Sequence, residues 1–290
     1  MHSRRLREFI AGTLAVSITS TARRLGLGLA GAVSVAAVAC GAEPVVPFEL
    51  RAEGEFPLQH VETTTSKGSQ NTTSASPYLG LTGTANLGSG LSTSAFANVG
   101  HPQLGSFRDN DDTFASAGGN LVKHWGAGFN TGVSIEHTHY YEDAFGRTTN
   151  IANDINLFAN YRWATNKDLK MTAGVTVTAR LDEAFAVERY SYGARFNIEQ
   201  QLFGSRWWVF ATPRVRYSDY VGADTGRRDA RFAIATGLRY EFNEYVSAKV
   251  LAGYENRQSN VVSRNSDKFA FGASIDFDFD FVRPRWPGGR

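Results

Sequence analysis

Apolar residues alternate with small or polar residues near the end of the chain, from Lys268 to Phe281. The apolar positions are Phe269, Phe271, Ala273, Ile275, Phe277, Phe279 and Phe281, and the positions between them include Asp276, Asp278 and Asp280. Successive side chains of a strand point to opposite faces, so this pattern predicts a β-strand with one aromatic face and one ionic face. A strand that separates lipid from a wet lumen requires such an arrangement.

Three upstream segments, 170–181, 190–202 and 231–242, repeat the alternation. In the first, Met171, Val175 and Val177 share the face opposite Lys170 and Thr172. Each segment is near the roughly ten residues of a tilted transmembrane strand, and no convincing helical period appears between them. The pattern predicts one all-β domain, a transmembrane antiparallel up-and-down β-barrel.

The connections alternate in length along the chain. Short ones lie at 125–128, 164–168, 204–205 and 243–244, and longer polar ones at 142–150, 182–188, 222–227 and 257–266. Outer-membrane barrels have short periplasmic turns and longer external loops, so each set is expected at one end of the barrel.

Large aromatic residues gather beside both sets of connections. Those beside the short turns are Trp125, Tyr161, Trp163, Trp207, Tyr240, Phe242, Tyr245 and Phe281, and those beside the long loops are Tyr141, Tyr190, Tyr192, Tyr217, Tyr254 and Phe269. Two such levels are typical of the aromatic girdles at the two membrane interfaces.

The number of strands is expected to be 12. Nine segments from Thr113 onward are clear, and residues 78–99 read as a further hairpin around Gly88-Ser89-Gly90. Single-chain bacterial barrels have an even number of strands, so one more strand is expected near 56–65. If residues 91–99 form a loop instead, the barrel has ten strands and the residues before Ser76 form a periplasmic extension or plug.

The chain ends and the composition suggest export. Residues 1–42 read as an export signal peptide, 43–55 as a periplasmic segment, 56–281 as the barrel and 282–290 as a periplasmic tail. The single cysteine, Cys40, excludes an internal disulfide, and a net charge of +2 gives no reason to expect a nucleic-acid partner. No stretch supplies the about 20 apolar residues of a spanning helix.

With these features, residues 56–281 resemble the bacterial outer-membrane β-barrel and porin-like proteins, whose last strand ends in an aromatic residue like the run FAFGASIDFDFDF of this chain. The resemblance implies location in the bacterial outer membrane, contact with its lipid, and an assembly signal at Phe277, Phe279 and Phe281 that the barrel-assembly machinery reads. It implies little about activity.

The lumen is the candidate functional site. The residues expected to line a channel and contact solute are Arg180, Arg195, Arg214, Arg216, Arg231, Asp276, Asp278 and Asp280. Opposed basic and acidic walls favour a passive channel for small polar or anionic solutes, since guanidinium groups bind carboxylate or phosphate through two bonds. The alternative is an internal salt-bridge network that fills a non-conducting barrel, which then presents external loops for structural or adhesive contacts.

Two clusters of residues contain side chains typical of catalytic or metal sites. In the run Glu136-His137-Thr138-His139 the strand period places both histidines on the outward face and Glu136 in the lumen, so they cannot readily orient one another. The acidic run 109–112 is more typical of a solvated turn than of a calcium site. We therefore expect no catalytic residue, metal site or cofactor, and we expect that the protein is not an enzyme.

Overall fold

The structure is a computed structural model that describes residues 48–75, 77–100, 113–141, 147–163, 168–183, 186–221 and 226–282. These all belong to the compact unit that spans residues 46–290. The expected export signal at 1–42, Cys40, the acidic run at 109–112 and the tail beyond Val282 lie outside the described residues.

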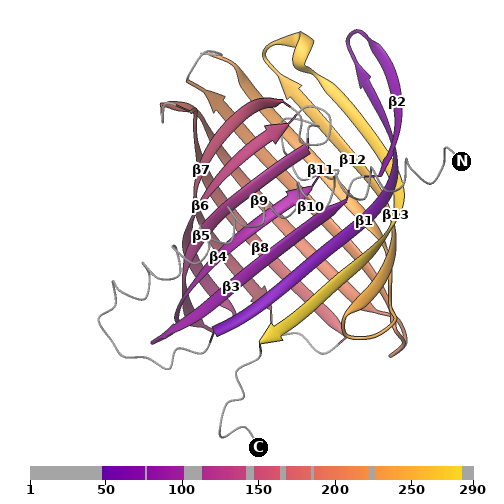
Figure 1. The fold of residues 1–290 in the computed structure, drawn as a ribbon. Coiled ribbons are helices and arrows are strands. Elements are labelled where there is room, and N and C mark those ends of the chain that lie inside the picture. The colour runs from indigo at the N-terminus through magenta and orange to yellow at the C-terminus, as the bar shows by residue number, and fades with distance from the viewer. Residues whose placement is uncertain are drawn as a thin grey trace, which may run out of the picture. The chain divides into compact units, whose positions relative to one another are not determined.

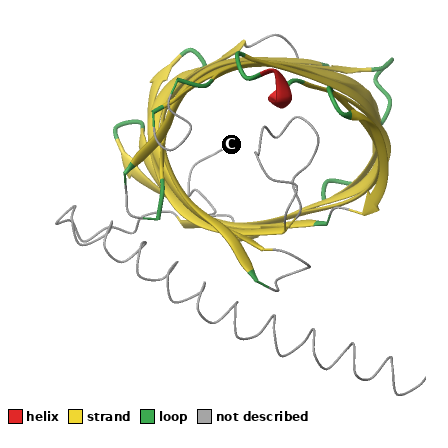
Figure 2. Cartoon of the chain, turned by 90° about the horizontal axis from the view of Figure 1, so that it is seen from above, coloured by secondary structure: helices red, strands yellow, loops and turns green. Residues whose placement is uncertain are grey.

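Within the described residues, all strands belong to one antiparallel sheet. They are β1 (Phe48–Thr65), β2 (Gly68–Ala75), β3 (Tyr78–Gly88), β4 (Leu91–Gly100), β5 (Thr113–Gly126), β6 (Phe129–Tyr141), β7 (Thr148–Trp163), β8 (Leu169–Leu181), β9 (Val187–Gln201), β10 (Trp207–Tyr220), β11 (Arg228–Glu241), β12 (Val246–Ser259) and β13 (Ser266–Val282), with a 3-10 turn η1 (Val262–Arg264) before β13. From β3 to β13 each strand pairs with the next one in the chain, β1 pairs with both β2 and β3, and β13 pairs with β1, which closes the barrel (Figures 1 and 2).

Two of the labelled strands, β2 and β3, lie end to end along the same partner. β2 pairs with β1 up to Leu58↔Ala75, and β3 continues in the same register from Glu55↔Tyr78. Pro77, between them, has no N–H to donate to the ladder, which accounts for the interruption. The barrel wall formed by the described residues therefore has 12 strands, as predicted. The ten-strand alternative is wrong, because residues 91–100 form β4 between β3 and β5.

The two ends of the barrel differ as the connection lengths predicted. Tight turns join β3 to β4, β5 to β6 and β9 to β10. The two central residues of the β3–β4 turn, Ser89 and Gly90, have φ of 50° and 72°. Positive φ at both turn residues is the geometry of a two-residue hairpin that follows the strand twist. The start of β1 and the end of β13 meet at this end through Leu50↔Val282, so it is the periplasmic end in the predicted orientation.

The β1–β2 hairpin extends the opposite, external end. β4 ends with Gly100 opposite Tyr78, whereas β2 continues beyond this level, paired with β1, and β1 remains paired with β13 up to Thr65↔Ser266 (Figure 1). The strand GSQNTTSA of β2 is polar throughout apart from its end, which suits a position outside the bilayer.

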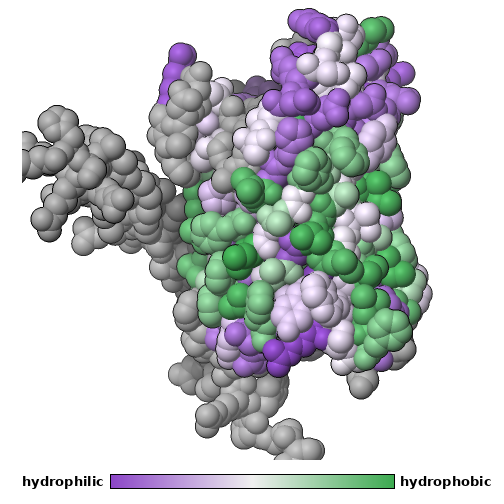
Figure 3. Space-filling model, turned by 90° about the vertical axis from the view of Figure 1, so that its right-hand side faces the viewer, coloured by the Kyte–Doolittle hydropathy of each residue, from purple (hydrophilic) through white to green (hydrophobic). Residues whose placement is uncertain are grey.

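The outward face of the barrel is apolar and the inward face is polar. Ile135, Leu157, Val175 and Phe271 are all more than half exposed, while Arg189 and Asp229 are buried. Figure 3 shows a band of hydrophobic side chains across the middle of one face with hydrophilic residues above and below it. This inversion is expected of a barrel in lipid. The architecture is that of an outer-membrane β-barrel.

The aromatic girdles are also present. Tyr240 contacts Trp207 and Phe242 near the periplasmic turns, with ring centroids 4.8 and 5.1 Å away, and Tyr190 and Tyr192 are exposed near the external end of β9. Rings of this kind anchor a barrel at the two interfaces.

One detail differs from the sequence-based expectation. β1 begins at Phe48, before the expected barrel start at Phe56, so part of the segment 43–55 belongs to the wall. In β10, Pro213 has no N–H to donate, and the ladder from β10 to β9 lapses between Ala211↔Ile198 and Arg214↔Arg195 and resumes without a change of register.

Candidate functional site

The predicted arginines come from the inward faces of four consecutive strands, β8 to β11. The pairing places Arg214 opposite Arg195 and Arg216 opposite Arg231. Like charges directly opposite one another in a sheet repel, so this wall needs compensation from other groups. Its five arginines are compensated in different ways.

Arg180 is held by one carboxylate on the neighbouring strand. Its Nε and Nη2 donate to the two carboxylate oxygens of Asp154 at 2.8 and 2.6 Å, and both side chains are largely buried. This two-bond pair occupies the fork that a solute carboxylate would use. Arg180 is thus a structural part of the wall between β7 and β8.

Near the external end, a buried carboxylate joins two further arginines. Asp229 has no exposed surface and accepts hydrogen bonds from Arg227 at 3.1 and 2.8 Å and from Arg257 at 3.1 and 2.5 Å. Arg227 and Arg189 also donate to the hydroxyl of Tyr220, each at 3.1 Å. These residues are not among the predicted channel-lining residues, although Asp229 shares the inward parity of Arg231.

The middle of the wall is more open. Arg195 is exposed, and its Nη2 donates to the Asn160 side chain at 3.2 Å. Among the described residues no carboxylate lies within ion-pair distance of Arg195. A Cβ at Gly174 would lie 2.3 Å from the Asn160 side-chain oxygen and 3.2 Å from Arg195 Nε, so glycine makes room for this contact. Arg195 therefore offers its guanidinium to the lumen.

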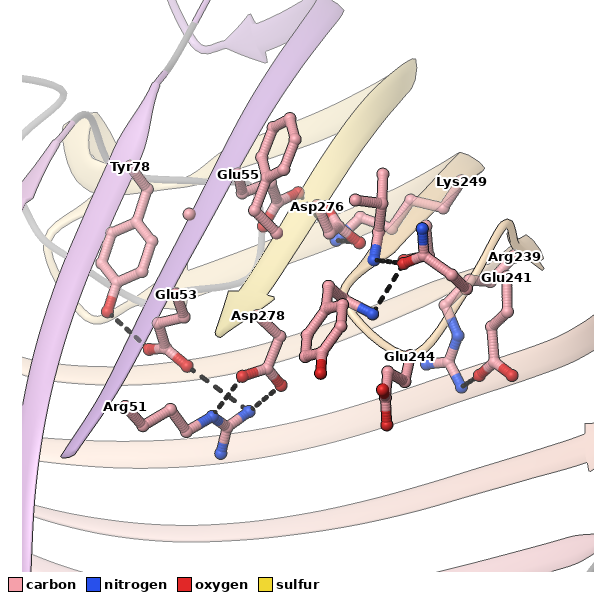
Figure 4. A pocket seen from close by; sticks show the side chains of 16 residues that line it. Arg51, Glu53, Glu55, Tyr78, Arg239, Glu241, Glu244, Lys249, Asp276 and Asp278 are labelled. Carbon is pink, nitrogen blue, oxygen red and sulfur yellow. Dashed lines mark hydrogen bonds and ion pairs between the residues drawn. The ribbon is translucent and has the colours of Figure 1, made fainter. Parts of the chain in front are cut away.

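Two aspartates of β13, Asp276 and Asp278, meet cations from the strands beside them rather than from the arginine wall. Asp278 accepts from Nε and Nη2 of Arg51 on β1 at 2.7 and 2.5 Å. Lys249 on β12 lies 3.4 Å from Asp276 and 2.7 Å from Glu55 (Figure 4).

These residues border a cavity of about 470 Å³ at the periplasmic end of the lumen. Its charged lining consists of the acids Glu53, Glu55, Glu241, Glu244, Asp276 and Asp278 and the bases Arg51, Arg239 and Lys249 (Figure 4). Acids outnumber bases two to one, so this end is acidic while the wall of β8 to β11 is basic. Charge therefore differs along the barrel axis as well as around it.

Three inward phenylalanines lie against glycines on the adjacent strand. A Cβ would lie 2.6 Å from Phe96 at Gly118, 2.5 Å from Phe158 at Gly132 and 2.9 Å from Phe210 at Gly237. Each pair is directly opposite in the ladder. The missing side chain of glycine lets each ring rest on the wall.

The assembly-signal residues have the expected position on β13. Phe277 and Phe279 stack with their centroids 6.3 Å apart, and Phe279 stacks on Tyr245 at 5.7 Å. Phe281 belongs to the strand, but its side chain is outside the described part. Their recognition by the assembly machinery stays a prediction.

The described residues contain no cluster of three or more His, Cys, Asp or Glu side chains arranged to hold a metal ion. They also contain no helix that is long and apolar enough to cross a bilayer.

No protein-family model and no curated protein matches this sequence. Among solved structures, the chain is similar to an outer membrane channel from Pseudomonas putida F1, with 12% identity, a TM-score of 0.49 and coverage of 82% of this chain and 97% of that one. It is similar to OmpT of Vibrio cholerae at 9% identity, TM-score 0.43, covering 82% and 99%. An anion-selective porin from Comamonas acidovorans matches at 11% identity, TM-score 0.39, covering 80% and 100%. These proteins are outer-membrane barrels and porins. The evidence that this chain forms a closed barrel is its own strand pairing.

Proposed function

We propose that this barrel is a passive channel for small polar solutes, with a preference for anions set by the arginine wall. The observation that carries the proposal is Arg195, an exposed guanidinium in the lumen opposite Arg214, without an ion-pair partner among the described residues. A planar guanidinium can bind a carboxylate or phosphate through two parallel bonds, and Asn160 holds this one in place. Arg216 and Arg231, which the sequence predicts to contact solute, extend the same wall.

The inward aromatic rings support an open path. Phe96, Phe158 and Phe210 rest on glycines of adjacent strands. A side chain in place of each glycine would push the ring toward the barrel axis, so the glycines keep the rings at the wall. Polar groups such as the hydrogen-bonded Ser191 and Ser218, 2.9 Å apart, cover the wall between charges. Such a surface keeps a pore wet, since it contains few apolar side chains that would favour dewetting.

A second function is favoured by a different observation, the β1–β2 hairpin that stands beyond β4 at the external end. A non-conducting barrel would use this polar hairpin for structural or adhesive contacts. The pairs Arg180–Asp154 and Arg257–Asp229 support this alternative, because ion pairs between neighbouring strands rigidify a filled lumen.

Planar-bilayer recording separates the two functions. The purified, folded barrel is expected to give discrete conductance steps, and the reversal potential in a KCl gradient is expected to indicate anion preference. Arg195→Ala should lower that preference, because it removes the accessible charge. Arg228→Ala is the matched control, since Arg228 lies 64% exposed at the start of β11 beside Asp219. Silence from correctly folded protein would overturn the channel, and unchanged selectivity in the Arg195 variant would overturn the role of the arginine wall.

A further inference from the structure

Two histidines on the outward face of β6 form a pair at the external rim. His137 and His139 are two residues apart, so they share one face of the strand. Their rings meet edge to face with centroids 4.7 Å apart, and the two Nε2 atoms are 2.8 Å apart. The ring of His139 also stacks on Tyr141 at 6.2 Å, which limits its rotation. The pair lies on the opposite face from the lumen, so its chemistry is independent of the channel.

The neighbouring strand determines which nitrogen of His137 carries its proton. The side-chain amide nitrogen of Asn153 donates to the backbone carbonyl of Asp182 at 3.0 Å, so the amide oxygen faces the other way. That oxygen lies 2.7 Å from Nδ1 of His137. An amide oxygen only accepts hydrogen bonds, so Nδ1 of His137 must be the donor. In the neutral ring Nε2 then carries a lone pair, directed at His139.

This arrangement is characteristic of a histidine that binds a metal. Metal-binding histidines donate their other ring N–H to a carbonyl or carboxylate, which orients the ring and raises the basicity of the binding nitrogen. Asn153 supplies such an acceptor and is itself held by Asp182. In the metal-free pair, His139 donates from Nε2 to Nε2 of His137. Metal binding requires this proton to move to Nδ1 of His139, without net release of a proton, and the two rings to turn until both Nε2 lone pairs point at the ion.

The distance between the two nitrogens favours particular metals. With metal–nitrogen bonds of about 2.0–2.1 Å, a nitrogen separation of 2.8 Å subtends about 86° at the ion. Adjacent positions of a square-planar or tetragonal ion are close to that angle, whereas a tetrahedral ion requires the rings to open. Imidazole suits copper, nickel and zinc, and copper(II) heads the affinity order of divalent ions. Glu183, after β8, acts electrostatically on His139 and adds a negative charge that favours a cation.

We propose that His137 and His139 form a two-histidine site for a divalent transition-metal ion, with copper(II) preferred, at the outward external rim of the barrel. Water completes the coordination, since no third His, Cys, Asp or Glu in the described residues joins the pair. A site with two protein ligands exchanges its ion readily. It therefore suits reversible capture at the cell surface rather than a permanent structural role.

The test uses the folded barrel purified without a histidine tag and stripped of metal. Calorimetric titration with copper(II) is expected to show one saturable equivalent, and electron paramagnetic resonance is expected to show coupling to two imidazole nitrogens. His137→Ala and His139→Ala should each abolish that equivalent, while His124→Ala and His60→Ala, which alter histidines hydrogen-bonded elsewhere, should retain it.

Asn153→Ala provides a test that keeps both histidines. Loss of an outer-shell hydrogen bond is expected to weaken copper binding by about 10–100-fold. Folding of each variant is checked by its heat-dependent gel mobility. If a histidine variant fails to fold, the wild-type spectrum decides. Coupling to fewer than two nitrogens, or equal binding by the double variant His137→Ala/His139→Ala, would overturn the site. Nickel and zinc titrations should give weaker binding than copper, and a preference for zinc would contradict the right-angle geometry.

Discussion

Two clusters of ion pairs line the lumen at opposite ends, and water reaches them to different extents. At the external end Asp229 is fully buried between Arg227 and Arg257, whose side chains are 9% and 16% exposed. At the periplasmic end Arg51 and Asp278 form an equally short pair while 51% and 46% exposed. A buried charge depends on its partner, because water cannot replace the partner once it is removed. An exposed charge finds water instead. The same chemical pair is thus structural at one end and available to the passing solution at the other.

The largest effect is expected from Asp229→Ala. The substitution leaves two arginines without their buried counter-ion, and breaking such a pair costs about 3–5 kcal/mol of unfolding free energy. Denaturant unfolding in detergent or lipid, followed by tryptophan fluorescence, measures the change. Asp219→Ala is the control, because Asp219 is 40% exposed and lies 3.6 Å from Arg228, so a loss of about 0–1 kcal/mol is expected. Equal losses for the two variants would show that burial does not distinguish them.

A smaller loss of stability is expected for Gly132→Ala in the barrel wall at β6. Gly132→Ala places a methyl group 2.5 Å from the Phe158 ring and 2.7 Å from the Leu121 carbonyl. Forcing an extra carbon into a packed site costs about 1–3 kcal/mol. The displaced ring should also reduce single-channel conductance. Gly193→Ala is the matched control on another inward position, where the nearest atom is 3.6 Å away and a change within about 0.5 kcal/mol is expected. A conductance that is unchanged in a destabilised Gly132 variant would mean that Phe158 does not border the solute path.

Sequence patterning could predict which way side chains face because the period of a strand is local. The alternation along β13 correctly placed Phe277 outward and Asp278 inward. It could not predict ion-pair partners, because these depend on the register between strands. Asp278 meets Arg51 only because β13 closes onto β1, which is more than two hundred positions earlier in the chain.

The start of the barrel was harder to predict for a related reason. The inward residues of the first part of β1 include Arg51, Glu53 and Glu55, while its outward residues Ala52 and Gly54 are small. Such a segment lacks the bulky outward face that marks a lipid-exposed strand, so it resembles a soluble extension. Its pairing with β13 and β3 makes it part of the wall.

The tautomer of His137 could not be predicted from the sequence either, since Asn153 is on another strand.

The smallest effect on stability is expected when the exposed pair Arg51–Asp278 at the periplasmic end is broken. The sign of the accompanying change in ion selectivity can be tested. Arg51→Ala and Asp278→Asn should each lower stability by only about 0–1 kcal/mol, because water solvates the remaining charge. Their effects on ion selectivity should be opposite. Removal of Arg51 leaves the acidic end more negative and should reduce anion preference, whereas neutralising Asp278 should increase it, since a pore attracts ions opposite in sign to its lining.

Reversal potentials at low salt give the clearest reading, because screening weakens exposed charges at high ionic strength. The double variant Arg51→Ala/Asp278→Asn restores the net charge of the wild-type pair and should return selectivity close to the wild-type value. Shifts of the same sign in both single variants would show that the pair acts through local structure rather than charge. In that case the axial charge difference would not govern which ions enter, and selectivity would have to arise at the arginine wall around Arg195.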